Sequence, residues 1–248
     1  MSPLALSCII FVLIVGGIFL GTLLRSALPG HHLSKDSQDI IRLGAGLVAT
    51  IAALVLGLLI TAAKSSFDTQ NSQVKQITAN IILLDEMLAQ YGPETRAIRQ
   101  QMRSTIGPFA DRLWRKEAGP TKRFEFSEAG EKIYLAVQSL SPQNDLQRSL
   151  QARAAQVSTD LAQTRLLLFV ESDNLIPVPF LAILVFWLVI IFASFSLFSE
   201  LNVTVAAFLA LFALSASCAI FLILELSQPF SGLMMISSTP LRNSLGPL

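Results

Sequence analysis

The stretch GLLITAAKSSFDTQNSQVKQITANIILLDEMLAQYG, residues 57–92, joins the end of an apolar run to a charged segment. Neither glycine nor proline occurs between its terminal glycines, so no helix breaker separates the two parts. In the second part, apolar residues recur at alternating steps of three and four, which is typical of a coiled-coil or bundle seam. This insert seam consists of Val74, Ile77, Ile81, Leu84, Leu88 and Tyr91. We therefore predict one continuous helix from about residue 39 to residue 91, ended by Gly92 and Pro93.

The composition indicates a membrane protein. Of the 248 residues, 52% are hydrophobic and 14% are charged, against about 25% charged in an average soluble domain. The apolar residues gather in four runs of about 20 residues, long enough to cross the roughly 30 Å hydrocarbon core as helices. The runs cover residues 4–24, 43–63, 179–198 and 203–224. The first lacks the positive start and cleavage site of a signal peptide, so we interpret it as a retained helix.

The runs divide the chain into four parts: transmembrane helices 1 and 2 in residues 1–63, an insert in 64–175, transmembrane helices 3 and 4 in 176–226, and an amphipathic tail in 227–248. The insert carries 14 Lys/Arg and 13 Asp/Glu, as expected of a water-soluble segment. Its helical patterns predict an antiparallel bundle, with Ser141 and Pro142 opening its last helix. The fold class is therefore all-α. Four spans place both termini and the insert on one side of the membrane, but Lys and Arg near the span ends do not decide which side.

Enzyme motifs are absent from the sequence. It contains no H-E-x-x-H, G-x-S-x-G or G-x-x-x-x-G-K-[ST], so we expect no enzyme and no catalytic, cofactor-binding or metal residues. Cys8 and Cys218 lie in separate apolar runs and suggest neither a disulfide framework nor a metal motif. His31 and His32 are adjacent in a loop; they form either a metal or proton site or, as we favour, a polar loop. A net charge of +1 gives no basic bias toward nucleic acid.

A basic cluster lies in the insert, interleaved with acidic and aromatic residues. It binds an anionic partner or lipid headgroups, or it is the solvated face of a helix, which is the interpretation that we favour. Its members are Arg112, Arg115, Lys116, Lys122 and Arg123. By contrast, no span has a charged residue near its centre. That pattern disfavours a proton-coupled transporter but is compatible with a channel, since apolar constrictions can gate pores.

The second span presents two contrasting patterns. A packing ridge of small residues recurs at every fourth position: Ala45, Ala49, Ala53, Gly57 and Thr61. Small residues at this spacing let helix backbones approach closely in lipid, so we expect the ridge to meet another helix, with Gly57 among the tightest contacts. The opposite side carries larger residues, the candidate pore neck Ile51, Val55 and Leu58. These residues face lipid if the helix only packs, and ring a narrow apolar neck if it lines a pore.

Three stretches resemble a large family of bacterial membrane proteins of unknown function, described as bestrophin-like. They are ATIAALVLGLLITAAKSSFD (49–68), LLDEMLAQYGPETRAIR (83–99) and ILELSQPFSGLMMISSTPLRNSL (223–245). The third contains the family-like tail motif Pro229, Phe230, Ser231 and Gly232, and the resemblance implies that the tail packs along the insert or a neighbouring subunit. The layout of two spans, insert and two spans is similar to that of bestrophins, homopentameric anion channels whose second span lines the pore. The acidic calcium clasp and aromatic-rich neck of the animal channels are absent from this sequence, so calcium gating and chloride selectivity are not implied.

Two functions follow as expectations. One is a homo-oligomeric, bestrophin-like ion channel or pore. The other is a non-conducting, membrane-anchored helical scaffold or sensor. In both cases the expected partners are the lipid bilayer and further copies of the chain, with ions added if the chain is a channel. The resemblance implies a bacterial inner membrane, with the termini and the insert in the cytoplasm.

Overall fold

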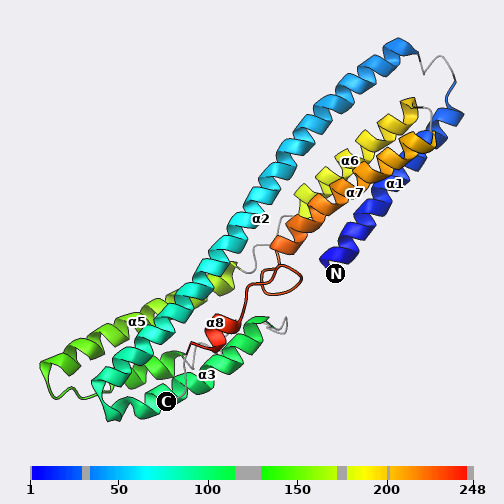
Figure 1. Ribbon diagram of the computed structural model, residues 1–248. Coiled ribbons are helices and arrows are strands. Elements are labelled where there is room, and N and C mark those ends of the chain that lie inside the picture. The colour runs from blue at the N-terminus through cyan, green and yellow to red at the C-terminus, as the bar shows by residue number, and fades with distance from the viewer. Residues whose placement is uncertain (1, 30–33, 115–129, 172–177, 200–201, 245–248) are drawn as a thin grey trace. The chain divides into compact units, whose positions relative to one another are not determined.

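The computed structural model describes residues 2–29, 34–114, 130–171, 178–199 and 202–244 (Figure 1). Within these residues the regular structure is helical throughout, with no strand, which confirms the all-α prediction. The chain divides into two compact units. The first contains Met1–Ser66 and Leu175–Ser227, and the second contains Phe67–Asn174 and Gln228–Leu248. The tail therefore groups with the insert.

The first unit holds four helices that are long and apolar enough to cross a membrane. Three of them are α1 (Pro3–Ala27), α6 (Val178–Phe198) and α7 (Val203–Leu226), and the fourth is the first part of α2 (Lys35–Tyr91). Helix α1 packs against both α6 and α7, as Figure 1 shows. Because each run is one uninterrupted helix, its backbone groups are satisfied internally, as lipid requires. The chain is therefore a multi-pass membrane protein.

Hydroxyl groups tie α1 to its two neighbours. The Ser196 hydroxyl donates to the carbonyl of Ile18, and the Ser217 hydroxyl donates to the carbonyl of Ser7, both at 2.6 Å. At the far end of α1, the Arg25 guanidinium donates to the carbonyl of Ser199, just beyond α6. A cation at this point is favourable because the last carbonyls of a helix carry partial negative charge.

Helix α2 is one helix of 57 residues, about 85 Å long at 1.5 Å per residue. This confirms the continuous helix predicted from the sequence. The helix begins at Lys35, four residues before the predicted start. Its end has a local cause: Gly92 adopts a φ of 139°, which favours glycine. The buried hydroxyl of Thr95 then lies 2.5 Å from the Leu88 carbonyl, to which its single proton can donate, and 2.8 Å from the Gly92 carbonyl, which accepts the Thr95 N–H at 3.3 Å.

The second unit is a helical bundle around one apolar core. A 3-10 turn (Pro93–Thr95) leads into α3 (Arg96–Trp114), and a helix in residues 130–138 precedes α5 (Asp145–Glu171). The prediction that Ser141 and Pro142 open this helix is wrong, because α5 begins at Asp145. Its cap is Asn144, whose side-chain oxygen accepts the Gln147 N–H at 2.8 Å. An N-cap residue stands directly before the first helical residue, as Asn144 does. Ser141 lies four residues before the helix and is too far away for this role.

Candidate functional site

The membrane part of α2 is the least enclosed of the four spans. Each of the four helices contains an apolar stretch of 18 residues. Within the chain, 17% of this stretch is buried in α2, against 28%, 22% and 28% in α1, α6 and α7. The side that packs within the chain carries Ala45, Ala52, Leu59 and Ala63, all buried. Steps of seven and four residues return to nearly the same helical angle, so these residues form one stripe. The remaining faces of this span are free to meet lipid or another chain.

The packing ridge starts in this buried stripe and then turns out of it. Ala45 is buried and Ala49 half-buried, while Ala53, Gly57 and Thr61 are exposed. Each step of four residues rotates the ridge by about 40°, because a turn takes 3.6 residues. A methyl group added at Gly57 would meet nothing within 4 Å in this chain. The described residues of this chain therefore make no tight contact at Gly57, and its contact with another helix stays a prediction.

The candidate pore neck lies on an exposed face of the same span. Ile51 and Leu58 expose 41% and 62% of their surface, and Val55 is half-buried between them along the helix. Leu47 and Leu54 are exposed on this face as well, which makes it a continuous apolar stripe. Two of the three neck residues are thus exposed on the surface of the chain and the third is half-buried, which leaves both lipid contact and a pore neck open.

The six residues of the insert seam all lie inside the second unit. Each is at most 5% exposed. Five of them share one core cluster with residues from α3, α5, residues 130–138 and the tail, while the sixth, Tyr91, gives its carbonyl to Gln147 of α5 at 2.9 Å. Burial raises the pKa of the Tyr91 hydroxyl, and the nearby Glu94 carboxylate raises it further. The seam is thus the part of α2 that holds the bundle together.

A charge pair at the edge of the seam fixes α3 on α2. Arg99 donates from Nε and Nη2 to the two carboxylate oxygens of Asp85, at 2.8 and 2.9 Å, and Arg103 approaches the same carboxylate at 3.5 Å. These hydrogen bonds from Arg99 hold the pKa of Asp85 below its usual value and raise that of Arg99. Bidentate pairing orients as well as attracts, so the contact sets the angle between the two helices.

The tail motif packs on α3. The Trp114 indole N–H donates to the carbonyl of Ile236 at 2.7 Å, and the Trp114 ring meets Phe230 edge-on, with centroids 5.4 Å apart. Between them the chain makes a closed turn, in which the N–H of Ile236 donates to the Pro229 carbonyl at 2.7 Å and Gly232 has a φ of 102°. Ser231 lies within this turn. The short helix α8 (Thr239–Arg242) follows and contacts α3.

The amino-acid sequence was compared with protein families, curated proteins and solved structures. The profile of the bestrophin-like domain matches residues 12–241, from within α1 to α8. The chain belongs to the bestrophin-like family. No match was found among curated proteins or among solved structures. The family assignment confirms the resemblance carried by the three stretches quoted above, of which the second contains both Asp85 and Arg99 and the third contains the tail motif.

Among the described glycines of the membrane spans, those of α1, not those of α2, lie closest to a neighbouring helix. A methyl group at Gly17 would come within 2.9 Å of the Val189 carbonyl oxygen, and one at Gly21 would collide with the Ala193 carbonyl of α6. This contact was not predicted from the sequence, although GIFLG (17–21) is a G-x-x-x-G motif, the signature of close helix packing in membranes. The ridge in α2 has the same kind of spacing, and only the structure shows which of the two meets a neighbour within the chain.

The remaining candidates from the sequence are the histidines, the cysteines and the basic cluster. Among the described residues, no three His, Cys, Asp or Glu side chains come together in a way that could hold a metal ion. Cys8 and Cys218 are free thiols on exposed positions of α1 and α7. His31 and His32 lie outside the described residues, as do residues 115–123 of the basic cluster and the side chain of Arg112. The bestrophin-like features that the structure describes are therefore helix surfaces and packing contacts.

Proposed function

We propose that this bestrophin-like chain forms a homo-oligomer in which the membrane part of α2 surrounds an ion-conducting pore. The observation that carries the proposal is the exposure of α2: it is the least buried span, yet it presents an ordered small-residue face and an apolar face. The family assignment supports it as well, since bestrophins line their pore with the second span. The proposal assigns no catalytic role to the chain.

The two faces of α2 suit different surroundings. Small residues such as Ala53 and Gly57 give little contact area to lipid chains, but they let a second helix approach closely. Large residues such as Ile51 and Leu58 suit either lipid or an apolar constriction, which gates ion flow by dewetting. In a ring of copies, the small face of one α2 packs on its neighbour while the Ile51 face turns toward the axis. By analogy with bestrophins, the proposed location is the bacterial inner membrane, with the insert and termini in the cytoplasm.

Flux measurements on reconstituted protein test the pore. The full chain is placed in liposomes, ion efflux is recorded, and particle symmetry is read from the same preparation. Ile51→Ala, Val55→Ala and Leu58→Ala are compared one at a time with wild type. Shrinking a neck residue widens the constriction, so at least one variant raises flux while the oligomer stays intact. Leu13→Ala is the matched control, because Leu13 is an exposed leucine of α1, 49% accessible.

A second variant separates assembly from conduction. Gly57→Leu places bulk on the small face and should dissociate the oligomer, whereas Gly16→Leu adds the same bulk to α1, where nothing lies within 4 Å. A monomeric wild-type particle in lipid would overturn the proposal. If none of the three alanine variants changes flux while Gly57→Leu dissociates the particle, α2 is a packing helix and not a pore wall. If wild-type liposomes show no ion flux above protein-free liposomes, the chain is a non-conducting scaffold or sensor.

A further inference from the structure

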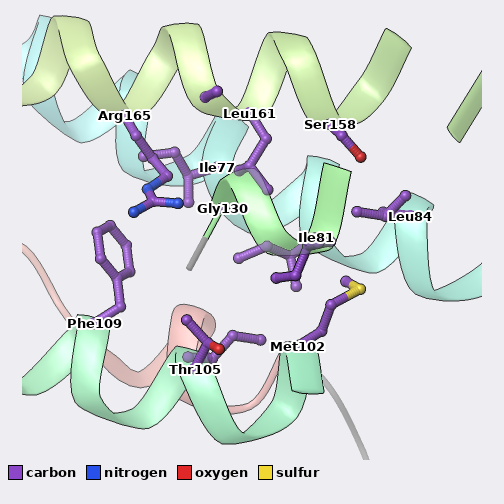
Figure 2. A pocket seen from close by; sticks show the side chains of 13 residues that line it. Ile77, Ile81, Leu84, Met102, Thr105, Phe109, Gly130, Ser158, Leu161 and Arg165 are labelled. Carbon is purple, nitrogen blue, oxygen red and sulfur yellow. The ribbon is translucent and has the colours of Figure 1, made fainter. Parts of the chain in front are cut away.

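The structure describes a small cavity inside the insert and a larger pocket in the membrane unit. The cavity has a volume of about 50 Å³ and lies in the bundle core, where the central carbon of the Arg165 guanidinium is 5.0 Å from the centre of the Phe109 ring (Figure 2). A water needs roughly 10–15 Å³ measured in this way, so the cavity has room for only about three to five waters. The larger pocket, of about 260 Å³, lies between α2 and α6 in the first unit.

This larger pocket lies where the apolar parts of α2 and α6 end. From α2 it is lined by Ile41, Arg42 and Ala45, and from the end of α6 by Phe195 and Phe198. Arg42 directly precedes the second apolar run, and Phe198 is the last residue of α6. Both positions are therefore at the edge of the hydrocarbon core, where the lipid headgroups begin.

The pocket has an inner wall and an exposed border. Ala45 is 7% exposed and belongs to the buried stripe of α2, so it forms part of the inner wall. Ile41 and Phe195 expose 39% and 46% of their surface, so they border the opening. A volume of 260 Å³ equals roughly 17–26 waters, which is ample for the about ten non-hydrogen atoms of a phosphoglycerol headgroup. Such a headgroup can enter while its acyl chains stay outside, along Ile41 and Phe195.

Arg42 gives the pocket a positive charge. Its guanidinium has no hydrogen-bond or ion-pair partner among the residues that the structure describes, and none of the described lining residues carries a carboxylate. Ser199 lines the pocket as well, and its carbonyl accepts a hydrogen bond from Arg25 of α1, so a second guanidinium lies beside the pocket. Positive groups gathered next to an apolar surface raise the local potential and attract an anion.

We propose that this pocket binds the headgroup of an anionic phospholipid, with the phosphate on Arg42 and the acyl chains leaving past Ile41 and Phe195. A guanidinium presents a fork of N–H donors that matches phosphate oxygens, and basic pockets between membrane helices bind anionic headgroups in other proteins. Phosphatidylglycerol is favoured over phosphatidylcholine, because the described lining offers no carboxylate to a choline cation. The pocket lies between helices of one chain, so the proposal stands independently of ion conduction.

Native mass spectrometry of the full chain, purified in a non-ionic detergent, tests the site. The protein is titrated with dioleoyl phosphatidylglycerol and, separately, with dioleoyl phosphatidylcholine, and the lipids bound to each chain are counted. The first phosphatidylglycerol should bind wild type at least about tenfold more tightly than phosphatidylcholine does. Glycerol phosphate, which offers the phosphate without acyl chains, should also bind at least about tenfold more weakly than phosphatidylglycerol.

Two variants locate the site on the chain. Arg42→Gln removes the charge in the pocket, so its affinity for phosphatidylglycerol should fall to that for phosphatidylcholine. Lys35→Gln is the matched control, because it removes an exposed charge from the same end of α2 at a residue that does not line the pocket. It should bind phosphatidylglycerol like wild type. Circular dichroism checks that both variants keep their helices.

Three results would overturn the proposal. Equal affinity of wild type for the two lipids would show that the pocket does not select an anionic headgroup. Glycerol phosphate that binds as tightly as phosphatidylglycerol would indicate a site for a soluble anion instead of a lipid. An undiminished preference for phosphatidylglycerol in Arg42→Gln would place the lipid elsewhere on the chain. The first two comparisons use only wild-type protein, so they decide the matter even if Arg42→Gln fails to fold.

Discussion

Asp85 of α2 and Arg99 of α3 face each other through two parallel hydrogen bonds, at 2.8 and 2.9 Å. Both side chains are largely shielded, with 14% and 20% of their surface exposed. Asp85→Asn keeps the shape but removes the charge, and should lower the free energy of unfolding by about 1.5–3 kcal/mol, the usual worth of a hydrogen bond to a charged group. Thermal unfolding of the full chain measures the loss. Asp145→Asn, which breaks the exposed pair with Arg148, should cost less.

The same pair predicts a pH dependence. The folded pKa of Asp85 lies below its unfolded value, so the stabilisation is complete above the unfolded pKa of about 3.9 and is lost as pH falls through the folded pKa. The difference in unfolding temperature between wild type and Asp85→Asn should therefore be constant from about pH 5 to 7 and shrink below about pH 4. A difference that does not change down to pH 2 would show that Asp85 acts through packing alone.

Ile81 and Ile82 are neighbours on α2 with opposite surroundings. Ile81 is 5% exposed inside the insert core, whereas Ile82 is 38% exposed. Ile81→Asp should destabilise the insert by about 3–5 kcal/mol, since it places an unpaired charge in an apolar core. Ile82→Asp introduces the same charge beside water and should cost far less. Chemical unfolding followed by circular dichroism compares them, and equal losses would contradict the seam assignment.

Gly21 and Gly16 make a similar comparison in the membrane. Gly21→Ala drives a methyl group into the Ala193 carbonyl of α6, while the same change at Gly16 meets nothing within 4 Å. Overpacking of this kind costs about 1–3 kcal/mol. Unfolding in mixed micelles with increasing sodium dodecyl sulfate should show the loss for Gly21→Ala only. If both variants unfold alike, α1 and α6 are not in this close contact in lipid.

Trp114 holds the tail on α3 through its indole N–H. Trp114→Phe keeps an aromatic ring against Phe230 but deletes the bond to the Ile236 carbonyl, which is worth about 1 kcal/mol. The amide of Ile236, which donates to the Pro229 carbonyl, should then exchange with deuterium several-fold faster. Trp187→Phe, in α6, is the control. Unchanged exchange in Trp114→Phe would mean that the tail is held by its other contacts.

The sequence by itself determined the elements of this protein. Span length and apolar content specify the membrane helices, because lipid admits only backbones that are satisfied internally. The continuity of α2 followed from the lack of a breaker between Gly57 and Gly92, and the seam from Val74 to Tyr91 followed from its step of three and four. These signals are local: each depends on residues within a few turns of one another.

The tertiary structure decided which faces meet. Gly17 with Gly21, and Gly57 in the ridge of α2, carry the same small-residue spacing. Among the described residues, the first pair closely approaches α6, whereas Gly57 has nothing within 4 Å of an added methyl group. Likewise, no local pattern shows that the tail binds Trp114, or that Arg165 lies over Phe109 beside a cavity. Such contacts join residues far apart in the sequence, and they depend on how whole helices rotate and pack. The pattern of one helix specifies which of its faces is small or apolar. Which helix packs on that face depends on all the other helix faces in the folded chain.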